Sequence, residues 1–234
     1  MTLLEKCFYI NLASRPDRLA HVTGQLTAMG IVGERFDAIK TDGGGGAIGC
    51  SMSHLRCLEL ARDRGYDRVF VCEDDIVFTD PALLSEQLQK FHESNTRWDV
   101  IVVGGNNHHP FTKMNDYSIQ VRNCQTTTGY VVNRHYYDML IENFREGIRF
   151  LSRTPSNKNE FAIDMYWKRL QSTGAWFMII PSTVTQLDGF SDIEGLVTRY
   201  DHLMLEYDKG GMRGMMGMRG ANGANGVNRA TGVM

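Results

Sequence analysis

Short apolar runs alternate along the first hundred residues with segments whose apolar residues recur every three or four positions. The runs at 6–12, 68–72 and 99–103 predict buried strands, and 34–39 predicts a weaker one. Helical spacing follows at 16–29, 51–64 and 81–92. Strands that alternate with helices predict βαβ units, and therefore an α/β fold with a largely parallel, Rossmann-like sheet flanked by helices.

The polar residues between these segments predict where the helices begin. Ser14 precedes Pro16, and Asp80 or Thr79 precedes Pro81, so each is a candidate helix cap. Further along, 117–132 predicts one or two β segments, 136–144 and 160–170 predict helices, and 176–180 predicts a last strand.

The C-terminal region has a different pattern. Glycine falls at every third position from Gly211 to Gly226, without proline. A collagen triple helix normally needs proline or hydroxyproline, so we expect a disordered, Gly-X-Y-like tail over 209–234 after a folded domain over 1–208.

Composition narrows the class of protein. The 234 residues suffice for one sizeable domain, and the net charge of −2 shows no basic excess, which argues against general nucleic-acid binding. The chain lacks an apolar run of about 18 residues, the length that spans a bilayer, so we expect no membrane span. The polar residues inside 1–12 predict a first strand rather than a signal peptide, and hence a cytoplasmic location (host cytoplasm if the protein is viral). The five scattered cysteines predict buried, reduced thiols.

Three acids, Glu73, Asp74 and Asp75, directly follow the clearest core strand. Ligands of α/β sheets bind beyond the carboxyl ends of the strands, and adjacent carboxylates repel one another unless a cation neutralises them. The trio therefore predicts a site for a hard divalent cation, with Glu73 and Asp75 on one side of the extended chain and Asp74 on the other. The alternative is a solvated acidic turn in which Asp74 or Asp75 is a cap.

Two further segments carry groups that suit a phosphate or a sugar. Asn11, Leu12, Arg15 and Arg18 lie at the exit of the first strand, where arginines can contact phosphates. Ser53 and His54 lie in the first turns of the helix predicted from residue 51, where N–H groups and hydroxyls suit a phosphate. Helix capping by Ser53 and a structural role for His54 are the alternatives.

Asp164 is flanked by apolar residues on a predicted helix, which is unusual because burying an unpaired acid is costly. It is a candidate general base for an acceptor hydroxyl, unless it is a surface acid that pairs with Lys168 or Arg169. A polar loop, 186–193, follows the last strand.

A competing interpretation rests on glycines. Gly44, Gly46 and Gly49 match G-x-G-x-x-G, the fingerprint of dinucleotide-binding oxidoreductases. The match does not follow its strand directly, and Glu73 is farther away than the usual spacing of about 20 residues.

Taken together, the ordered motifs resemble glycosyltransferase family 25, the family of bacterial lipopolysaccharide galactosyltransferases and collagen hydroxylysine galactosyltransferases. The resemblance extends over about residues 6–195. It rests on segments 8–12, 15–18, 48–54, 69–75, 128–132, 163–166, Gln186 and 191–193.

The resemblance implies a GT-A-like nucleotide-sugar-binding fold with a D-x-D-like metal site at Glu73 and Asp75. Asp75 would be the main ligand of Mn²⁺ or another divalent metal, and Glu73 would contact the metal through water, or the ribose. The family is regarded as inverting, with Asp164 here as the candidate base. The donor would be UDP-galactose, UDP-glucose or another UDP-sugar.

The same resemblance implies that a hydroxyl of a glycan or of a collagen-like protein accepts the sugar. Its C-terminal blocks make Gln186, Ser191 and Asp192 candidates for the acceptor side or its loop. Two alternatives stay open: the dinucleotide-dependent oxidoreductase, and a non-catalytic homologue that acts through its collagen-like tail.

Overall fold

The structure is a computed structural model that describes residues 3–41, 45–191, 196–198 and 201–209. Its elements, in chain order, are β1 (Cys7–Asn11), α1 (Pro16–Ala28), β2 (Gly33–Asp37), α2 (Gly46–Asp63), β3 (Arg68–Glu73), β4 (Ile76–Phe78), α3 (Pro81–Glu93), β5 (Val100–Asn107), β6 (Phe111–Lys113), β7 (Ser118–Val121), β8 (Cys124–Asn133), η1 (Arg134–Tyr136), α4 (Tyr137–Arg153), η2 (Pro155–Asn157), α5 (Lys158–Phe161), α6 (Ile163–Tyr166), α7 (Lys168–Gln171), β9 (Trp176–Ile179), β10 (Val184–Gln186), β11 (Gly189–Ser191), β12 (Leu196–Thr198) and α8 (Asp201–Met204).

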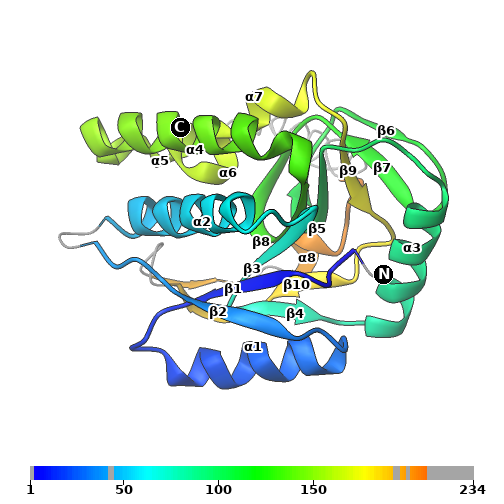
Figure 1. Cartoon of the computed structure of the whole chain (residues 1–234), viewed down its shortest axis with the longest axis horizontal. Helices are drawn as coiled ribbons and strands as arrows, with labels where there is room; N and C mark the ends of the chain where they lie inside the picture. The colour runs from blue at the N-terminus through cyan, green and yellow to red at the C-terminus, as the bar shows by residue number, and fades with distance from the viewer. Residues whose placement is uncertain (1–2, 42–44, 192–195, 199–200, 210–234) are drawn as a thin grey trace, which may run out of the picture.

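The central sheet has eight strands in the order β2-β1-β3-β8-β5-β9-β7-β6 (Figure 1). Strands β2, β1 and β3 are parallel neighbours, and β5 pairs in parallel with β9. Strand β8 lies between β3 and β5 and runs antiparallel to both. The carboxyl ends of β1, β3 and β5 therefore lie at the same edge of the sheet as the beginning of β8.

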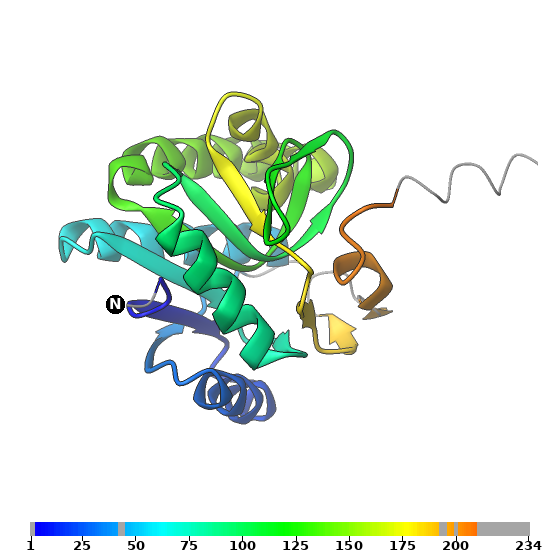
Figure 2. The same ribbon diagram turned by 90° about the vertical axis from the view of Figure 1, so that its right-hand side faces the viewer.

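Helices cover both faces of this sheet (Figures 1 and 2). Side chains of β1 alternate between two cores: Phe8 and Ile10 pack on the face covered by α2 and α4, and Cys7 and Tyr9 pack on the face covered by α1 and α3. This alternation is what a strand buried on both faces requires. The predicted fold class, an α/β sheet flanked by helices, is confirmed. The sheet is mixed, because β1, β2 and β3, and β5 with β9, pair in parallel while β6, β7 and β8 pair antiparallel with their neighbours.

Three local predictions were wrong. The helix predicted from residue 51 begins at Gly46, so Ser53 and His54 lie beyond its first turn. Ser14 does not cap α1: the N-cap residue is Arg15, which makes no side-chain capping bond, whereas Asp80 does cap α3 by accepting the N–H of Leu83. The helix predicted over 160–170 is divided into α5, α6 and α7. Ala162, which is extended with ψ of 149°, makes the break between α5 and α6. The interruption places Asp164 in the first turn of α6.

Some predictions fall outside what the structure describes. The Gly-X-Y-like tail lies beyond the last described residue, Lys209, so the division into 1–208 and 209–234 stays a prediction. Over the described residues, each helix is too short or too polar to cross a lipid bilayer. The cytoplasmic location stays a prediction.

Candidate active site

A cleft of about 560 Å³ opens at the edge of the sheet where β1 and β3 end and β8 begins. The first turns of α2 and the short helices α5 and α6 form its other walls. Among the residues that line it are most of the sequence-predicted site residues, namely Leu12, Arg15, Arg18, Ser53, His54, Glu73, Asp74, Asp75, Asp164 and Gln186. The topology thus brings together segments that are up to about 170 residues apart in the chain.

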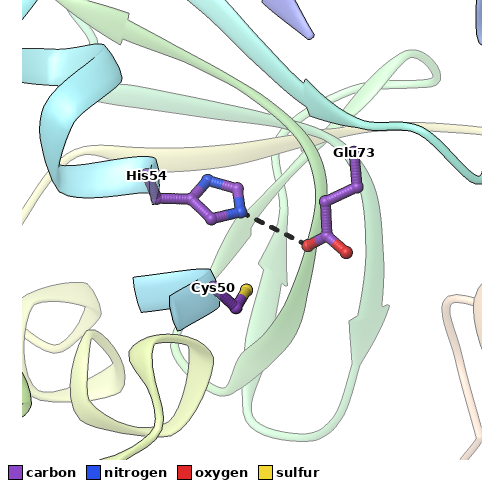
Figure 3. Close-up of side chains that lie close together, drawn as sticks. All are labelled: Cys50, His54 and Glu73. Atoms are coloured by element: carbon purple, nitrogen blue, oxygen red, sulfur yellow. Dashed lines mark ion pairs between the residues drawn. The ribbon is translucent and has the colours of Figure 1, made fainter. Parts of the chain in front are cut away.

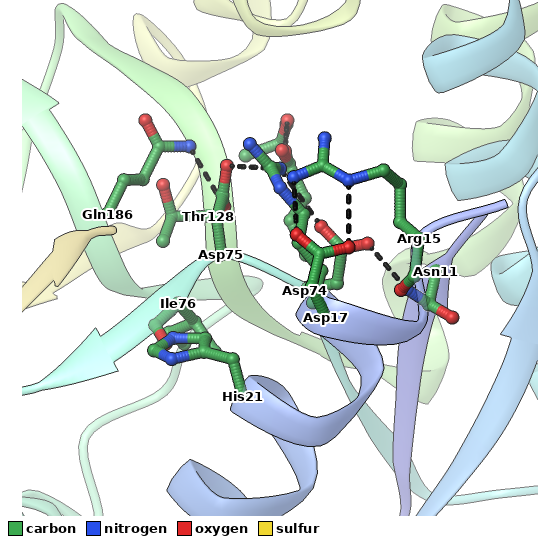
Figure 4. A network of polar contacts seen from close by, with 12 residues as sticks. Asn11, Arg15, Asp17, His21, Asp74, Asp75, Ile76, Thr128 and Gln186 are labelled. Atoms are coloured by element: carbon green, nitrogen blue, oxygen red, sulfur yellow. Dashed lines mark hydrogen bonds and ion pairs between the residues drawn. The ribbon is translucent and has the colours of Figure 1, made fainter. Parts of the chain in front are cut away.

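Asp74 is held by two side chains at the cleft floor (Figure 4). Its Oδ2 accepts a hydrogen bond of 2.7 Å from the Asn11 amide, and its Oδ1 accepts one of 3.1 Å from Arg18. Asn11 in turn accepts a hydrogen bond from Arg35. Burial raises the pKa of Asp74, although Asn11 and Arg18 oppose the shift. Both carboxylate oxygens are occupied, so Asp74 orients Arg18 and Asn11 within the site.

Asp75 faces the same arginine. The Nη1 of Arg18 also lies 3.1 Å from Asp75 Oδ2, and Gln186 donates to Oδ1 at 3.4 Å. The alternation expected along an extended chain therefore stops at Glu73: a turn at residues 74–75 directs both aspartates toward Arg18. Burial, then the nearby charge of Glu73, raises the pKa of Asp75 to about 7. The carboxyl groups of the acid trio therefore carry more negative charge than the single positive charge of Arg18 neutralises.

Glu73 is stabilised in its charged form. Its Oε1 accepts a hydrogen bond of 2.5 Å from the Thr127 hydroxyl and lies 3.5 Å from Nε2 of His54 (Figure 3). Burial alone would raise the pKa of Glu73, but His54, Thr127 and Arg18 together lower it. Glu73 is therefore a carboxylate at neutral pH, next to an aspartate that titrates near neutrality.

Arg15 and Leu12 lie at the mouth of the cleft, on the segment between β1 and α1. Arg15 forms an ion pair of 2.8 Å with the exposed Asp17, and this contact lowers the pKa of Asp17 to about 2. An exposed ion pair of this kind is weak, so replacing Asp17 by an anionic ligand at Arg15 costs little free energy.

Ser53 and His54 are fully buried in α2. The Ser53 hydroxyl donates to the carbonyl of Gly49 and accepts the N–H of Ile39, both at 2.8 Å. His54 Nδ1 lies 2.9 Å from the hydroxyl of Tyr130. Ser53 therefore fixes the loop at Ile39 against α2, and its hydroxyl is occupied by backbone.

Asp164 lies across the cleft, at the start of α6. Its Oδ2 accepts the backbone N–H of Thr126 at 3.0 Å, and burial raises its pKa. Thr126 has a φ of 69°, a left-handed conformation that is costly for a β-branched residue. Backbone strain at a cleft wall is typical of a functional site.

Sequence reasoning missed several lining residues. Thr126, Thr127, Lys158 and Asn159 have no local signal, since threonines inside a strand are ordinary. The five cysteines were predicted to be buried, but Cys50 is half-buried and lines the cleft. Of the predicted C-terminal residues, Gln186 lines the cleft, Ser191 ends β11, and Asp192 lies outside the described residues.

The sequence profile described as "Glycosyltransferase family 25 (LPS biosynthesis protein)" matches residues 44–167, more than half of the chain. The chain belongs to glycosyltransferase family 25. The matched region contains α2, the acid trio and Asp164, which are the walls of the cleft. Membership makes the protein a glycosyltransferase and favours that activity over the dinucleotide-dependent oxidoreductase.

This glycosyltransferase is also distantly similar to solved structures. A mannose-1-phosphate geranyltransferase from Thermus thermophilus shares 8% identity at a TM-score of 0.43, covering 75% of this chain and 73% of that one. A glycosyltransferase involved in glycosylation of the major capsid of PBCV-1 has 10% sequence identity and a TM-score of 0.40, and the match covers 76% of this chain and 93% of that one. A mutant Drosophila β1,4-galactosyltransferase 7, in complex with manganese, UDP-Gal and xylobiose, has 13% sequence identity and a TM-score of 0.34. The match covers 58% of this chain and 52% of that one. No curated protein matches the chain.

Proposed function

We propose that this family 25 glycosyltransferase transfers a hexose, galactose or glucose, from a UDP-sugar to a hydroxyl group of a glycan or protein, with inversion at the anomeric carbon. The observation that carries the proposal is the buried acid trio that faces the cleft within the region matched by the family profile. The donor and the acceptor are those that the family resemblance implies, and the groups around the cleft support binding of a metal and of a diphosphate.

The donor set of Glu73 and Asp75 fits a hard divalent cation such as Mn²⁺. Carboxylate oxygens are the ligands that such ions prefer, and the raised pKa of Asp75 is the sign of a buried site that lacks positive charge. Asp75 would be the main ligand, with Glu73 contacting the ion through water, or the ribose. When bound, the cation takes up charge that develops on the leaving diphosphate.

The protein's own groups support binding of that diphosphate. The N-terminus of α2, an 18-residue helix, lines the cleft at Gly46 and Ala47 and adds the positive end of a helix dipole. Arg15 and Lys40 also line the cleft. These groups orient a nucleoside diphosphate beside the carboxylates of the acid trio.

Asp164 is the proposed general base. Thr126 holds one carboxylate oxygen, and the other would accept the proton of the acceptor hydroxyl as the new glycosidic bond forms. Burial makes Asp164 a stronger base than an exposed aspartate. The buried Gln186 and the 40%-exposed Leu187 line the cleft and are proposed to form part of the acceptor side, together with Ser191 and Asp192.

The test is release of UDP from UDP-galactose and UDP-glucose, with Mn²⁺ and with a chelator. We expect turnover only with the metal, and a rate at least about 100-fold lower in Asp75→Asn. The matched control is Asp116→Asn, on the β6–β7 hairpin, where the Asp116 side chain is 98% exposed. Equal metal-dependent rates in wild type and Asp75→Asn would contradict the assignment, and donor binding without turnover would favour the non-catalytic homologue.

A further inference from the structure

A second set of potential metal ligands lies on the wall of the cleft (Figure 3). The Sγ of Cys50, a ring nitrogen of His54 and a carboxylate oxygen of Glu73 all lie within 4.8 Å of one another. Cys50 and His54 are four residues apart on α2, so both project from the same side of the helix toward the end of β3.

The separations are close to those of a tetrahedral metal site. Bonds of about 2.0–2.2 Å to nitrogen and oxygen at a tetrahedral angle place two such ligands roughly 3.4 Å apart. His54 Nε2 and Glu73 Oε1 lie 3.5 Å apart. A thiolate, with a bond of about 2.3 Å, would lie roughly 3.6 Å from each. The Sγ of Cys50 lies within 4.8 Å of both atoms.

The state of His54 is the second, independent observation. Its side chain is fully buried, and Nε2 makes no hydrogen bond among the described residues; the group it faces is the Glu73 carboxylate at 3.5 Å, a member of the same set. Nδ1 lies 2.9 Å from the Tyr130 hydroxyl, whose oxygen can accept a hydrogen bond from an Nδ1–H group. A metal-ligating histidine typically binds through one nitrogen while the other donates to such an acceptor, so Tyr130 prepares Nε2 as a ligand.

We propose that Cys50, His54 and Glu73 form a binding site for a thiophilic divalent cation of the Zn²⁺ class, with its fourth position open to the cleft. The thiol of Cys50 gives up its proton on binding, and the metal takes lone pairs from Nε2 of His54 and from the Glu73 carboxylate. Mn²⁺ prefers oxygen ligands, so the sulfur makes this site chemically distinct from the one at Asp75.

The site has a consequence for catalysis that rests on the proposed function, because Glu73 belongs to both sets. A cation bound to Cys50 and His54 withdraws Glu73 from the donor's metal. Zn²⁺ is therefore an inhibitor that acts from within the cleft, at concentrations at which Mn²⁺ is still in excess.

The metal alone provides the first test. Co²⁺ added to the metal-free protein is expected to give the sulfur-to-cobalt charge-transfer band in the near ultraviolet, and Zn²⁺ is expected to displace it. Cys50→Ser should abolish the band and weaken Zn²⁺ binding at least about 100-fold, since the loss of even an outer-shell partner costs 10–100-fold. Asp75→Asn, which removes the oxygen site, should keep the band.

Absence of the band in wild type, or its persistence in Cys50→Ser, would overturn the proposal. Circular dichroism and thermal unfolding of each variant check that it is folded, and the proton released on adding Zn²⁺ to wild type gives a second measurement that needs no variant. None of these readouts needs a sugar donor, so failure of the glycosyltransferase assignment leaves them intact. Where UDP release is measurable, Zn²⁺ should inhibit wild type and spare Cys50→Ser, each relative to its own zinc-free rate.

Discussion

The carboxylate of Asp164 accepts the backbone N–H of Thr126 at 3.0 Å, and this bond joins α6 to a residue of β8 in a left-handed conformation. The next residue, Thr127, donates its hydroxyl to Glu73. The candidate base and the acid trio are therefore connected through two successive threonines, and the roles of Asp164 as a base and as a support can be separated by substitution.

Asp164→Asn keeps an oxygen that accepts the Thr126 N–H but removes the base. We expect kcat to fall by about 10²–10⁴-fold with little change in the KM for the donor and in the melting temperature. Asp164→Ala also leaves the Thr126 N–H without a partner and should in addition lose about 1–3 kcal/mol of stability. Similar kcat values for wild type and Asp164→Asn would assign Asp164 a supporting role only.

The raised pKa of Asp75 predicts how stability depends on pH without metal. A carboxyl whose pKa is about 7 in the folded protein and about 3.9 in the unfolded chain binds more protons when folded between these values. Stability should therefore fall as pH rises from about 4 to 7 and then level off. Asp75→Asn should lose the share of this slope that Asp75 contributes, while Asp74 and Asp164, whose pKa values burial also raises, keep theirs. Above pH 7 in a chelator, the variant should be more stable than wild type by at most about 4 kcal/mol, as measured by urea unfolding.

Arg18 provides the positive charge between Asp74 and Asp75. Arg18→Gln leaves two buried carboxylates without it, so we expect a loss of about 2–4 kcal/mol in the free energy of unfolding, partly restored by Mn²⁺. Arg15→Gln is the matched control, since its partner Asp17 is exposed, and its effect should be much smaller. Equal losses in the two variants would show that Arg18 does not balance the trio.

Two glycine-to-alanine substitutions should change the stability of the protein in opposite directions. At Gly49 a Cβ would lie 2.3 Å from the carbonyl oxygen of Ile39, so Gly49→Ala must displace this cleft wall and should cost about 1–3 kcal/mol and weaken donor binding. Gly24 lies inside α1, and a Cβ there would meet nothing within 4 Å, so Gly24→Ala should stabilise the protein by up to about 1 kcal/mol. Thermal unfolding and UDP-sugar titration of both variants check this.

The order of most strands and helices was predictable because its determinants are local. The apolar runs and helical spacings give the elements, and Asp80 with Pro81 gives the beginning of α3. The cleft was predictable in part, because acids at a strand end have a known place in α/β sheets. The contacts of Glu73 with Thr127 and of Asp75 with Arg18 join residues 54 and 57 positions apart, and a local pattern does not indicate that β8 will be placed antiparallel beside β3. The break at Ala162 was missed for the same reason.

The reversed direction of β8 determines what kind of sequence change the protein tolerates there. Thr126 and Thr127 reach the cleft only because β8 keeps its register with β3 on one side and, across two irregularities, with β5 on the other. One added or deleted residue between Cys124 and Gly129 would rotate every following side chain to the opposite face. Homologous chains are therefore expected to vary in composition along this strand while its length stays fixed.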